Sequence, residues 1–239
     1  MQQLLNHIIE AHGGMARWKS FNTLSAHLSQ GGIIWPLKGK AGLLDEVDVT
    51  VRLHQPWTSH SPFGAAQRRT AVTPERVAIE NSDGTLLEEV LAPRATFDGH
   101  QLDTPWSDAQ LAYFVGYAMW NYLTMPFTLA LPGFDIAELP AWQENGLTLR
   151  RLQVSFPPQL ATHSPVQTFY FSPDGLLRRH DYEVDISGGA PAVHYLSGHT
   201  EVQGIVVPTS HRIFVRDADG GHQAEPLVVS IDVSAIKLA

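Results

Sequence analysis

Cysteine is absent from this sequence of 239 residues. Its absence excludes disulfide bonds, zinc–thiolate sites and cysteine nucleophiles together. Other catalytic signatures are missing as well: there is no HExxH or HxH pattern, no GxSxG turn and no Walker-type glycine loop. The motifs therefore predict neither a metal site nor a cofactor.

Positive charge is scarce. The chain has 16 basic and 24 acidic residues, a net charge of −8, and no run of Lys or Arg. Proteins that bind nucleic acid show a clustered basic surface. We therefore expect no nucleic-acid partner.

Membrane-directing segments are also lacking. The N-terminal stretch MQQLLNHIIEAHGG has no basic leader and no continuous apolar core, so it is not typical of a signal peptide, and we expect a cytoplasmic location. The apolar stretch 111–131 approaches the length of a membrane span. Asn121, Thr124 and Pro126 interrupt it and both flanks are acidic, so we predict a soluble protein without a transmembrane segment.

The stretch 107–132 organises the rest of the chain. No charged residue lies between Asp108, near its start, and Asp135, just beyond its end. Ser107 and Gln110 form a Ser-x-x-Gln capping box, which predicts a helix beginning there, and Pro126 predicts its end near residues 123–125. Because the helix is apolar all round, it must be buried.

Strand patterns surround this helix. In residues 46–53 valines alternate with polar residues, which is typical of an antiparallel strand with one dry face. About six such strands precede the central helix and about five follow it, with a helix over residues 3–19 that breaks at Gly13-Gly14. We predict one domain, 1–239, of the mainly β (α+β) class. Its long antiparallel sheet, of about eleven strands, curls as a half-barrel around the apolar helix.

This order of elements resembles the LolA/LolB-type lipoprotein-carrier fold, a half-open β-barrel with helices over its mouth. The resemblance lies in the helix that runs through Gly13-Gly14 and Trp18, the hairpin 171–176 (FSPDGL) and the strand start 204–209 (GIVVPT). The resemblance extends over most of the chain, but it concerns the topology, that is, the order of helices and strands. The resemblance implies an apolar cavity for acyl chains under the helices. The chain departs from the family in lacking a visible export signal and a lipobox cysteine.

Strand alternation gives candidate site residues. Arg178, His180 and Tyr182 share the less polar face of their strand, so we expect them to point inward. The other face holds Arg179, Asp181, Glu183 and Asp185, which we expect to be solvated. His211 lies on an apolar face, and His199 shares a face with Val193 and Tyr195. Consecutive antiparallel strands are usually neighbours, so His180, His199 and His211 could lie close together.

These histidines allow three interpretations. Each could be a neutral side chain that is satisfied inside the core. They could form a polar head-group site in which Arg178 faces a carboxylate or phosphate. They could also form a metal or acid–base site with His180 as the base, although Asp181 lies on the wrong face to orient it.

The aromatic side chains of the central helix have a similar ambiguity. Tyr113, Tyr117 and Trp120 are core residues or line a ligand cavity. Our leading hypothesis is a binding protein for an apolar or amphipathic small molecule, held between the sheet and the helix. Arg178, His180 and His211 would fix its head group. The alternatives are an enzyme that uses the same His/Arg cluster and an interaction module with a packed interior.

Overall fold

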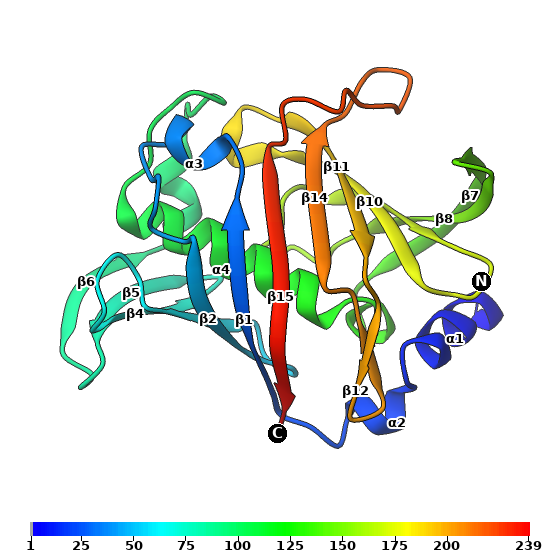
Figure 1. Cartoon of the computed structure of the whole chain (residues 1–239), viewed down its shortest axis with the longest axis horizontal. Helices are drawn as coiled ribbons and strands as arrows, with labels where there is room; N and C mark the ends of the chain where they lie inside the picture. Colours follow the sequence, from blue (N-terminus) through cyan, green and yellow to red (C-terminus); the bar gives the residue numbers. More distant parts are fainter. Residues whose placement is uncertain (1) are drawn as a thin grey trace.

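One antiparallel sheet of 13 strands dominates the computed structural model, which describes residues 2–239. Its first and last strands, β1 (Thr23–Gly31) and β15 (Val229–Leu238), pair with each other in the middle of the sheet. Figure 1 shows these two strands side by side, in blue and red. The first and the last strand along the chain therefore meet at the centre of the sheet.

The remaining strands extend from this central pair to two unpaired edges. Toward one edge follow β2 (Glu46–Arg52), β3 (Trp57–Ser61), β4 (Arg68–Thr73), β5 (Arg76–Asn81) and β6 (Leu86–Leu91). Toward the other edge follow β14 (Ser210–Val215), β11 (Ala190–Ser197), β10 (Leu177–Val184), β9 (Val166–Phe171), β8 (Leu147–Ser155) and β7 (Asp135–Glu144). The predicted curled antiparallel sheet is confirmed, and it does not close into a barrel.

The strand count is higher than predicted. The sequence pattern of residues 193–202 predicts one strand, but the chain is divided at Gly198, which has a positive φ of 65°, into β11 and β12 (Thr200–Val202). The pattern of residues 205–216 likewise predicts one strand, but it is divided around Pro208 into β13 (Ile205–Val207) and β14. Strands β12 and β13 pair with each other in a separate two-stranded ribbon.

Within residues 2–239, four α-helices accompany the sheet. They are α1 (Gln2–Ala11), α2 (Met15–Trp18), α3 (Ile34–Leu37) and α4 (Asp108–Thr124). Three short 3₁₀ helices lie in the connections: η1 (Pro93–Phe97), η2 (Phe127–Ala130) and η3 (Asp185–Ser187). The break between α1 and α2 falls at Gly13-Gly14, as predicted. No helix in residues 2–239 is both long and apolar enough to cross a membrane.

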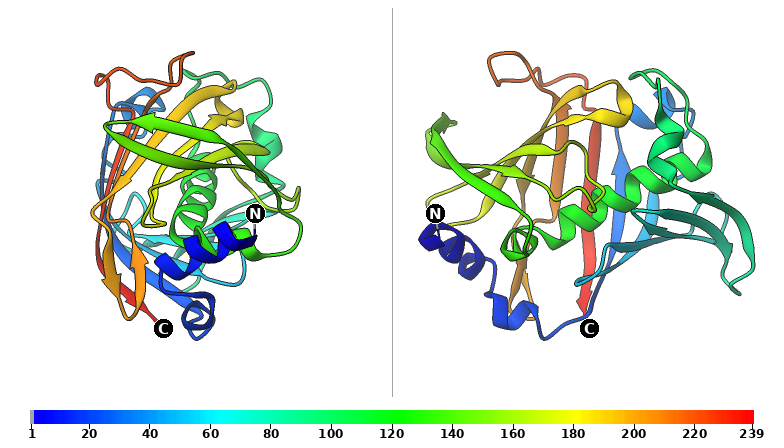
Figure 2. Two further views of the ribbon diagram at one scale, coloured as in Figure 1. Left: turned by 90° about the vertical axis from the view of Figure 1, so that its right-hand side faces the viewer. Right: turned by 180° about the vertical axis from the view of Figure 1, so that it is seen from behind.

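Helix α4 begins and ends as its sequence predicts. The Ser107 hydroxyl accepts a hydrogen bond from the Gln110 amide N–H at 3.1 Å, and the Gln110 side-chain oxygen accepts one from the Ser107 N–H at 2.9 Å. The helix stops one residue before Met125, which precedes Pro126. From position 109 onward every residue except Gln110 is buried. Figure 2 shows α4 crossing the concave face of the sheet.

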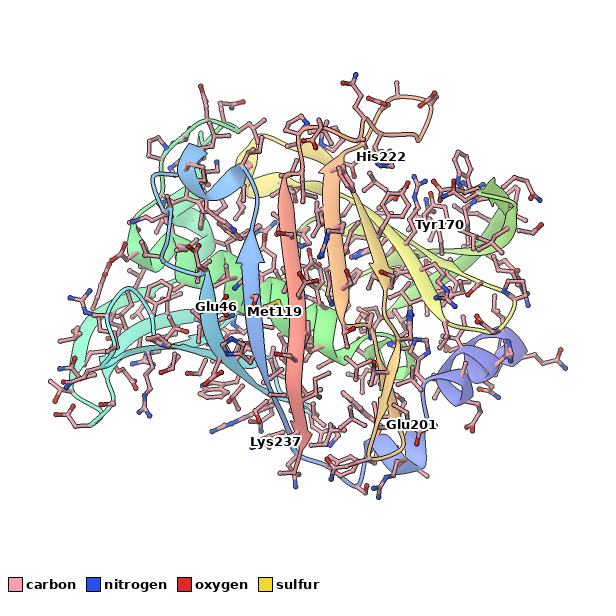
Figure 3. All side chains as sticks on the ribbon, viewed as in Figure 1. Glu46, Met119, Tyr170, Glu201, His222 and Lys237 are labelled. Carbon is pink, nitrogen blue, oxygen red and sulfur yellow. The ribbon has the colours of Figure 1, made fainter. Side chains whose placement is uncertain are left out.

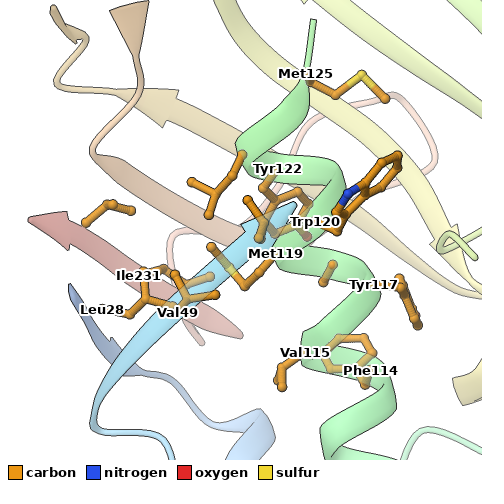
Figure 4. Close-up of a cluster of buried hydrophobic side chains, with 14 of the residues drawn as sticks. Leu28, Val49, Phe114, Val115, Tyr117, Met119, Trp120, Tyr122, Met125 and Ile231 are labelled. Carbon is orange, nitrogen blue, oxygen red and sulfur yellow. The ribbon is translucent and has the colours of Figure 1, made fainter. Parts of the chain in front are cut away.

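The helix lies closest to strands β2 to β5. Gly116 allows this approach, because a Cβ atom at that position would lie 2.7 Å from Val72 Cγ1. The Thr58 hydroxyl also donates a hydrogen bond to the Gly116 carbonyl at 2.9 Å. Met119, which lies about one turn further along the helix, points toward side chains of the central strands (Figure 4). Helix α4 is therefore held off-centre in the half-barrel.

Candidate functional site

An apolar cavity lies between α4 and the central strands β15, β14, β11 and β10. Its volume is about 150 Å³. Helix α4 contributes Phe114, Val115, Ala118, Met119 and Tyr122, and the sheet contributes Tyr182, Val184, Ala192, Ile213, Val229 and Ile231. No charged side chain lines it within the described residues. The cavity exists because α4 is drawn toward β2–β5 on its other side.

The mouth of the cavity is unusually apolar. Ile33, Leu37, Leu102 and Val215 all line the cavity, and their exposed fractions are 45%, 38%, 44% and 46%. Large exposed aliphatic side chains are normal when scattered, but a continuous set marks a binding surface. These four residues therefore form an apolar rim that is continuous with the cavity wall.

A buried lysine holds one side of this mouth. Lys38 follows α3 and is fully buried, and its ammonium donates to the backbone carbonyls of Gln101 and Thr104 at 3.2 Å each. The ammonium also lies 4.5 Å from the centre of the Trp106 ring. Burial lowers the pKa of Lys38 to about 8. The lysine fixes the segment 101–106 against α3, and with it the position of Trp106 in the cavity wall.

Two tyrosines separate the cavity from a polar layer beneath it. Tyr122 and Tyr182 line the cavity, and their hydroxyls hydrogen bond to each other at 2.7 Å. The Tyr122 hydroxyl also bonds His163 Nε2 at 2.9 Å, and the Tyr117 hydroxyl lies 3.2 Å from His163 Nδ1. Both hydroxyls at the cavity wall are thus satisfied within the protein.

Four buried histidines form this polar layer: His163, His180, His194 and His211. Their rings pack on the two tyrosines, with the His163 ring stacked 4.0 Å from that of Tyr182 and the His194 ring 4.5 Å from that of Tyr122. His194 and His211 also hydrogen bond to each other at 2.9 Å.

All four imidazoles are held neutral. Burial, joined for His163 by the nearby Arg94 cation, lowers the pKa of His163 to about 3. Burial lowers the pKa of His211 to about 4, and it lowers those of His180 and His194 well below the usual value. A buried cation in an apolar surrounding is costly, so the neutral form dominates.

The structure brings part of the predicted histidine cluster together. His180, Tyr182 and His211 point into the concave side of the sheet and lie near one another. The sequence did not lead us to His194, which pairs directly with His180 across β10 and β11, or to His163, which lies in the loop before β9. Among these five only Tyr182 lines the cavity.

Arg178 and His199 lie elsewhere, which corrects our expectation. The pairing of β10 with β9 is irregular between Leu177 and Arg179, and this shift turns Arg178 away from the inner face. Its guanidinium bonds Asp174 at 2.9 Å and faces His199 Nδ1 at 3.3 Å, at the 171–176 hairpin. The imidazole of His199 bonds the Leu177 carbonyl at 2.9 Å. Neither residue reaches the cavity.

Tyr113, Tyr117 and Trp120 face the other side of α4. Trp120 Nε1 donates to the carbonyls of Arg52 and Gln55 at 2.8 Å each, so it anchors the β2–β3 turn. Tyr113 lines a second hollow of about 550 Å³, together with Arg94 and the segment 156–162. None of the three lines the apolar cavity.

The predicted solvated face of β10 is also wrong in part. Arg179 is fully buried, and its guanidinium bonds both oxygens of Asp181 at 2.8 Å and the Glu144 carboxylate at 2.8 Å. Its charge lies over the rings of Tyr170 and Tyr195. The β7–β8 hairpin and the 216–226 loop cover this outer face, and Figure 3 labels Tyr170 and His222 in that region. Strand alternation alone could not reveal such a cover.

No group of three or more His, Asp or Glu side chains within residues 2–239 is arranged to hold a metal ion. The nearest candidates are the four neutral histidines, and none of them lines the cavity. The geometry of the site is therefore that of an apolar chamber, with a polar support layer behind its wall.

No family model matches this sequence, and no curated protein matches it either. Solved structures do match. A DUF1329 family protein from Desulfovibrio piger superposes with a TM-score of 0.57 and 10% identity, over 99% of this chain and 92% of that one. A LolA superfamily protein from Nitrosomonas europaea superposes with a TM-score of 0.55 and 9% identity, over 100% of this chain and 93% of that one.

A third structure, a candidate outer membrane lipoprotein-sorting domain from Vibrio parahaemolyticus, gives a TM-score of 0.54 and 8% identity, over 99% and 92% of the two chains. At such low identity these matches establish the fold alone. The chain has a LolA/LolB-like fold, as the resemblance in its sequence predicted.

Proposed function

We propose that this protein binds a small apolar, lipid-like molecule in the cavity between α4 and the central strands. The single observation that carries the proposal is an apolar chamber without a charged wall residue that continues into an exposed apolar rim. Ligand sites in proteins are typically concave and mostly apolar, with few polar groups. Binding would derive from buried apolar area, at about 25 cal/mol per Å² before ordering costs.

The size of the cavity limits what it can enclose. An apolar cavity of 150 Å³ accommodates a molecule such as benzene, and this chamber has about that volume. A ligand with a longer hydrocarbon chain would therefore place one end in the chamber and extend through the mouth over Ile33, Leu37, Leu102 and Val215.

The structural neighbours support a lipid-like ligand. The names of two of them refer to the LolA superfamily and to lipoprotein sorting. The predicted head-group role of Arg178 is not part of the proposal, because that residue lies at the 171–176 hairpin. The cytoplasmic location stays a prediction.

The two alternatives have less support. An enzyme that uses His180 and His211 would need them exposed to the cavity, whereas both lie behind the tyrosine wall. A packed interaction module would have no hollow at this place.

The test is to titrate the wild type and Ala118→Leu with benzene and to measure binding by NMR. Ala118 lines the cavity, so the larger side chain should occupy the space and weaken benzene binding at least about tenfold. Because it fills a void, it should leave the unfolding temperature unchanged or raise it.

Ala112→Leu is the matched control on the same helix. Ala112 is fully buried and does not line the cavity, so overpacking there should lower the unfolding temperature. Benzene binding that is absent in the wild type, or unchanged in Ala118→Leu, would show that the proposal is wrong. Native mass spectrometry before and after organic extraction would reveal any ligand that co-purifies.

A further inference from the structure

A second hollow, of about 550 Å³, lies on the other side of α4 from the apolar cavity. The two spaces share no lining residue. The volume of the second hollow falls within the range of about 300–1,000 Å³ that is usual for small-molecule sites. Unlike the apolar cavity, it has two charged side chains in its wall, Glu75 and Arg94. The proposed function leaves this hollow without a role.

Four parts of the fold meet around this second hollow. The β4–β5 turn contributes Glu75, η1 contributes Arg94 and α4 contributes Tyr113, while the loop between β8 and β9 supplies residues 156–162 and 165. Most of the lining residues are apolar, and four are prolines: Pro74, Pro157, Pro158 and Pro165. Because proline has a fixed φ, this wall needs little backbone ordering when a ligand binds.

Arg94 is fixed in the wall by its neighbours and still has donors to offer. Its guanidinium donates to the Thr162 carbonyl at 2.9 Å and to the Asp185 carboxylate at 3.2 Å. A guanidinium has five N–H donors, so these two bonds leave others for a ligand. The Arg94 side chain is 40% exposed, so it can be reached from solvent.

The hydroxyl of Tyr113 lies under the influence of both charges. Burial raises the pKa of Tyr113, the Arg94 cation opposes this rise, and the Glu75 carboxylate adds to it. The two charges are nevertheless not paired with each other. Arg94 pairs with Asp185, and the exposed Glu75 carboxylate forms no ion pair within residues 2–239. The hollow therefore presents a cation and an anion, each with capacity for a further partner.

These charges define the complementary ligand. A carboxylate suits the planar guanidinium of Arg94, and it can also accept a hydrogen bond from the Tyr113 hydroxyl. An ammonium suits the Glu75 carboxylate. An anion alone would be repelled by Glu75 and Asp185, and a cation alone would leave the free donors of Arg94 unused. The matching molecule carries both charges on an aliphatic body that contacts the prolines.

We propose that the second hollow binds a small zwitterion, an aliphatic amino acid or dipeptide, whose carboxylate contacts Arg94 and Tyr113 and whose ammonium contacts Glu75. This inference goes beyond the proposed function. It concerns a different hollow, and it does not depend on a ligand in the apolar cavity.

The experiment compares leucyl-leucine with two analogues that each lack one charge. N-Acetyl-leucyl-leucine has no ammonium, and leucyl-leucine amide has no carboxylate. Dissociation constants are measured by isothermal titration calorimetry at pH 7, where the terminal amine is mostly protonated. The wild type should bind leucyl-leucine at least about threefold more tightly than either analogue, because each analogue leaves one charge of the hollow unmatched. Free leucine is titrated alongside, and the tighter of the two zwitterions identifies the source.

Two substitutions assign the charges to residues. Glu75→Gln should weaken the binding of leucyl-leucine about 3- to 5-fold without weakening that of N-acetyl-leucyl-leucine, which has no ammonium. Arg94→Gln should weaken leucyl-leucine by a similar factor and change the binding of leucyl-leucine amide less. Glu75 is exposed and has no ion-pair partner in the described chain, so Glu75→Gln should fold normally and keeps the test decisive.

The matched controls are Glu88→Gln and Arg150→Gln. Both residues are exposed outside the hollow, and Arg150 pairs with Glu138 much as Arg94 pairs with Asp185. Neither control should change the binding of leucyl-leucine. Ala118→Leu, which fills the apolar cavity, should also leave it unchanged, and this result separates the two sites.

The outcomes are distinct from those of the benzene titration. If neither leucyl-leucine nor leucine binds the wild type, or if the analogues bind as tightly as leucyl-leucine, the inference is wrong, whatever benzene does. Losses in Glu75→Gln and Arg94→Gln that do not exceed those of their controls would also overturn it. Tighter binding of glycerophosphoethanolamine, whose anion is a phosphodiester, would exclude the carboxylate. A loss in each variant that depends on the matching charge of the ligand supports the inference.

Discussion

The two halves of the concave face use different side chains. Toward the β6 edge, strands β2, β4 and β5 point aliphatic groups such as Val49, Val72 and Ile79 at α4, and the helix packs on them closely. Toward the β7 edge, strands β10, β11 and β14 present His180, Tyr182, His194 and His211. Small branched side chains allow close helix–sheet contact, which Gly116 completes.

This difference places the cavity. Over strands β3 and β4 the space beside the helix measures only about 10 Å³, whereas toward the strands that carry large rings joined by hydrogen bonds the helix leaves the chamber of about 150 Å³. Hydrogen-bonded rings keep their positions because moving one would leave buried polar atoms unpaired. We infer that the polar half holds the chamber open and the aliphatic half anchors the helix.

Acidification should have the largest effect, and it acts mainly on the polar half. His163 and His211 have folded-state pKa values of about 3 and about 4, below the unfolded value of 6.5. Their contribution to stability is therefore complete above pH 6.5 and declines as the pH falls through 6.5 toward those values. At pH 5 each should reduce the free energy of unfolding by about 2 kcal/mol. His180 and His194 act in the same direction.

Urea denaturation at pH 7.5 and pH 5 measures this loss. His60 is buried on β3, in the aliphatic half, and has a pKa of about 3. Its protonation therefore also lowers the free energy of unfolding as the pH falls. The double variant His194→Leu, His211→Leu should therefore show a smaller loss than the wild type, while the exposed His7→Gln should not change it. Equal losses in all three proteins would contradict the assignment to buried imidazoles.

The next effect concerns the outer face of the polar half. Replacing Arg179 by Met would leave the half-buried Glu144 without its cation and the buried Asp181 carboxylate with only Arg216, at 3.9 Å. Breaking a buried ion pair in this way costs about 3–5 kcal/mol, which chemical denaturation would detect.

Arg212→Met is the matched control for Arg179→Met. Arg212 pairs with Asp232 at 2.8 Å on an exposed part of the sheet, so its loss should cost less than about 1 kcal/mol. Similar losses in the two variants would mean that the covered network contributes no more than a surface pair.

The smallest effect tests the aliphatic half. Gly116→Ala gains about 1 kcal/mol of helix propensity but places a methyl group against Val72. We expect a net loss of about 1–2 kcal/mol, together with weaker benzene binding because α4 is pushed toward the chamber. Val72→Ala in the Gly116→Ala background should restore both quantities in part. A variant that is as stable as the wild type and binds equally well would show that the close approach is not needed.

The sequence predicts most of the fold because its signals are local. The Ser107–Gln110 capping box, Pro126 and the charge-free stretch between them define α4, and alternation defines strands such as β2. These features depend on neighbouring residues alone, so no knowledge of the tertiary structure is required.

The site was harder to predict because it depends on register and cover. One irregularity between Leu177 and Arg179 moved Arg178 off the inner face, since a shift of one residue reverses a strand's side chains. Both faces of β11 are buried, so Val193 and Tyr195 seemed to mark the inner face and concealed His194. No local signal shows that Glu75 and Arg94 line one hollow, because they lie in separate connections that only the folded chain brings together.

The pairing of β1 with β15 also has a consequence for synthesis. These strands are separated by nearly the whole chain, yet they form the central seam of the sheet. Until residues 229–238 have left the ribosome, β1 and β14 each carry an open edge where the finished sheet is continuous. Contacts between such distant segments form slowly, and open edges invite pairing with other chains. We expect the nascent protein to remain two unjoined half-sheets, and most in need of protection, until residues 229–238 emerge.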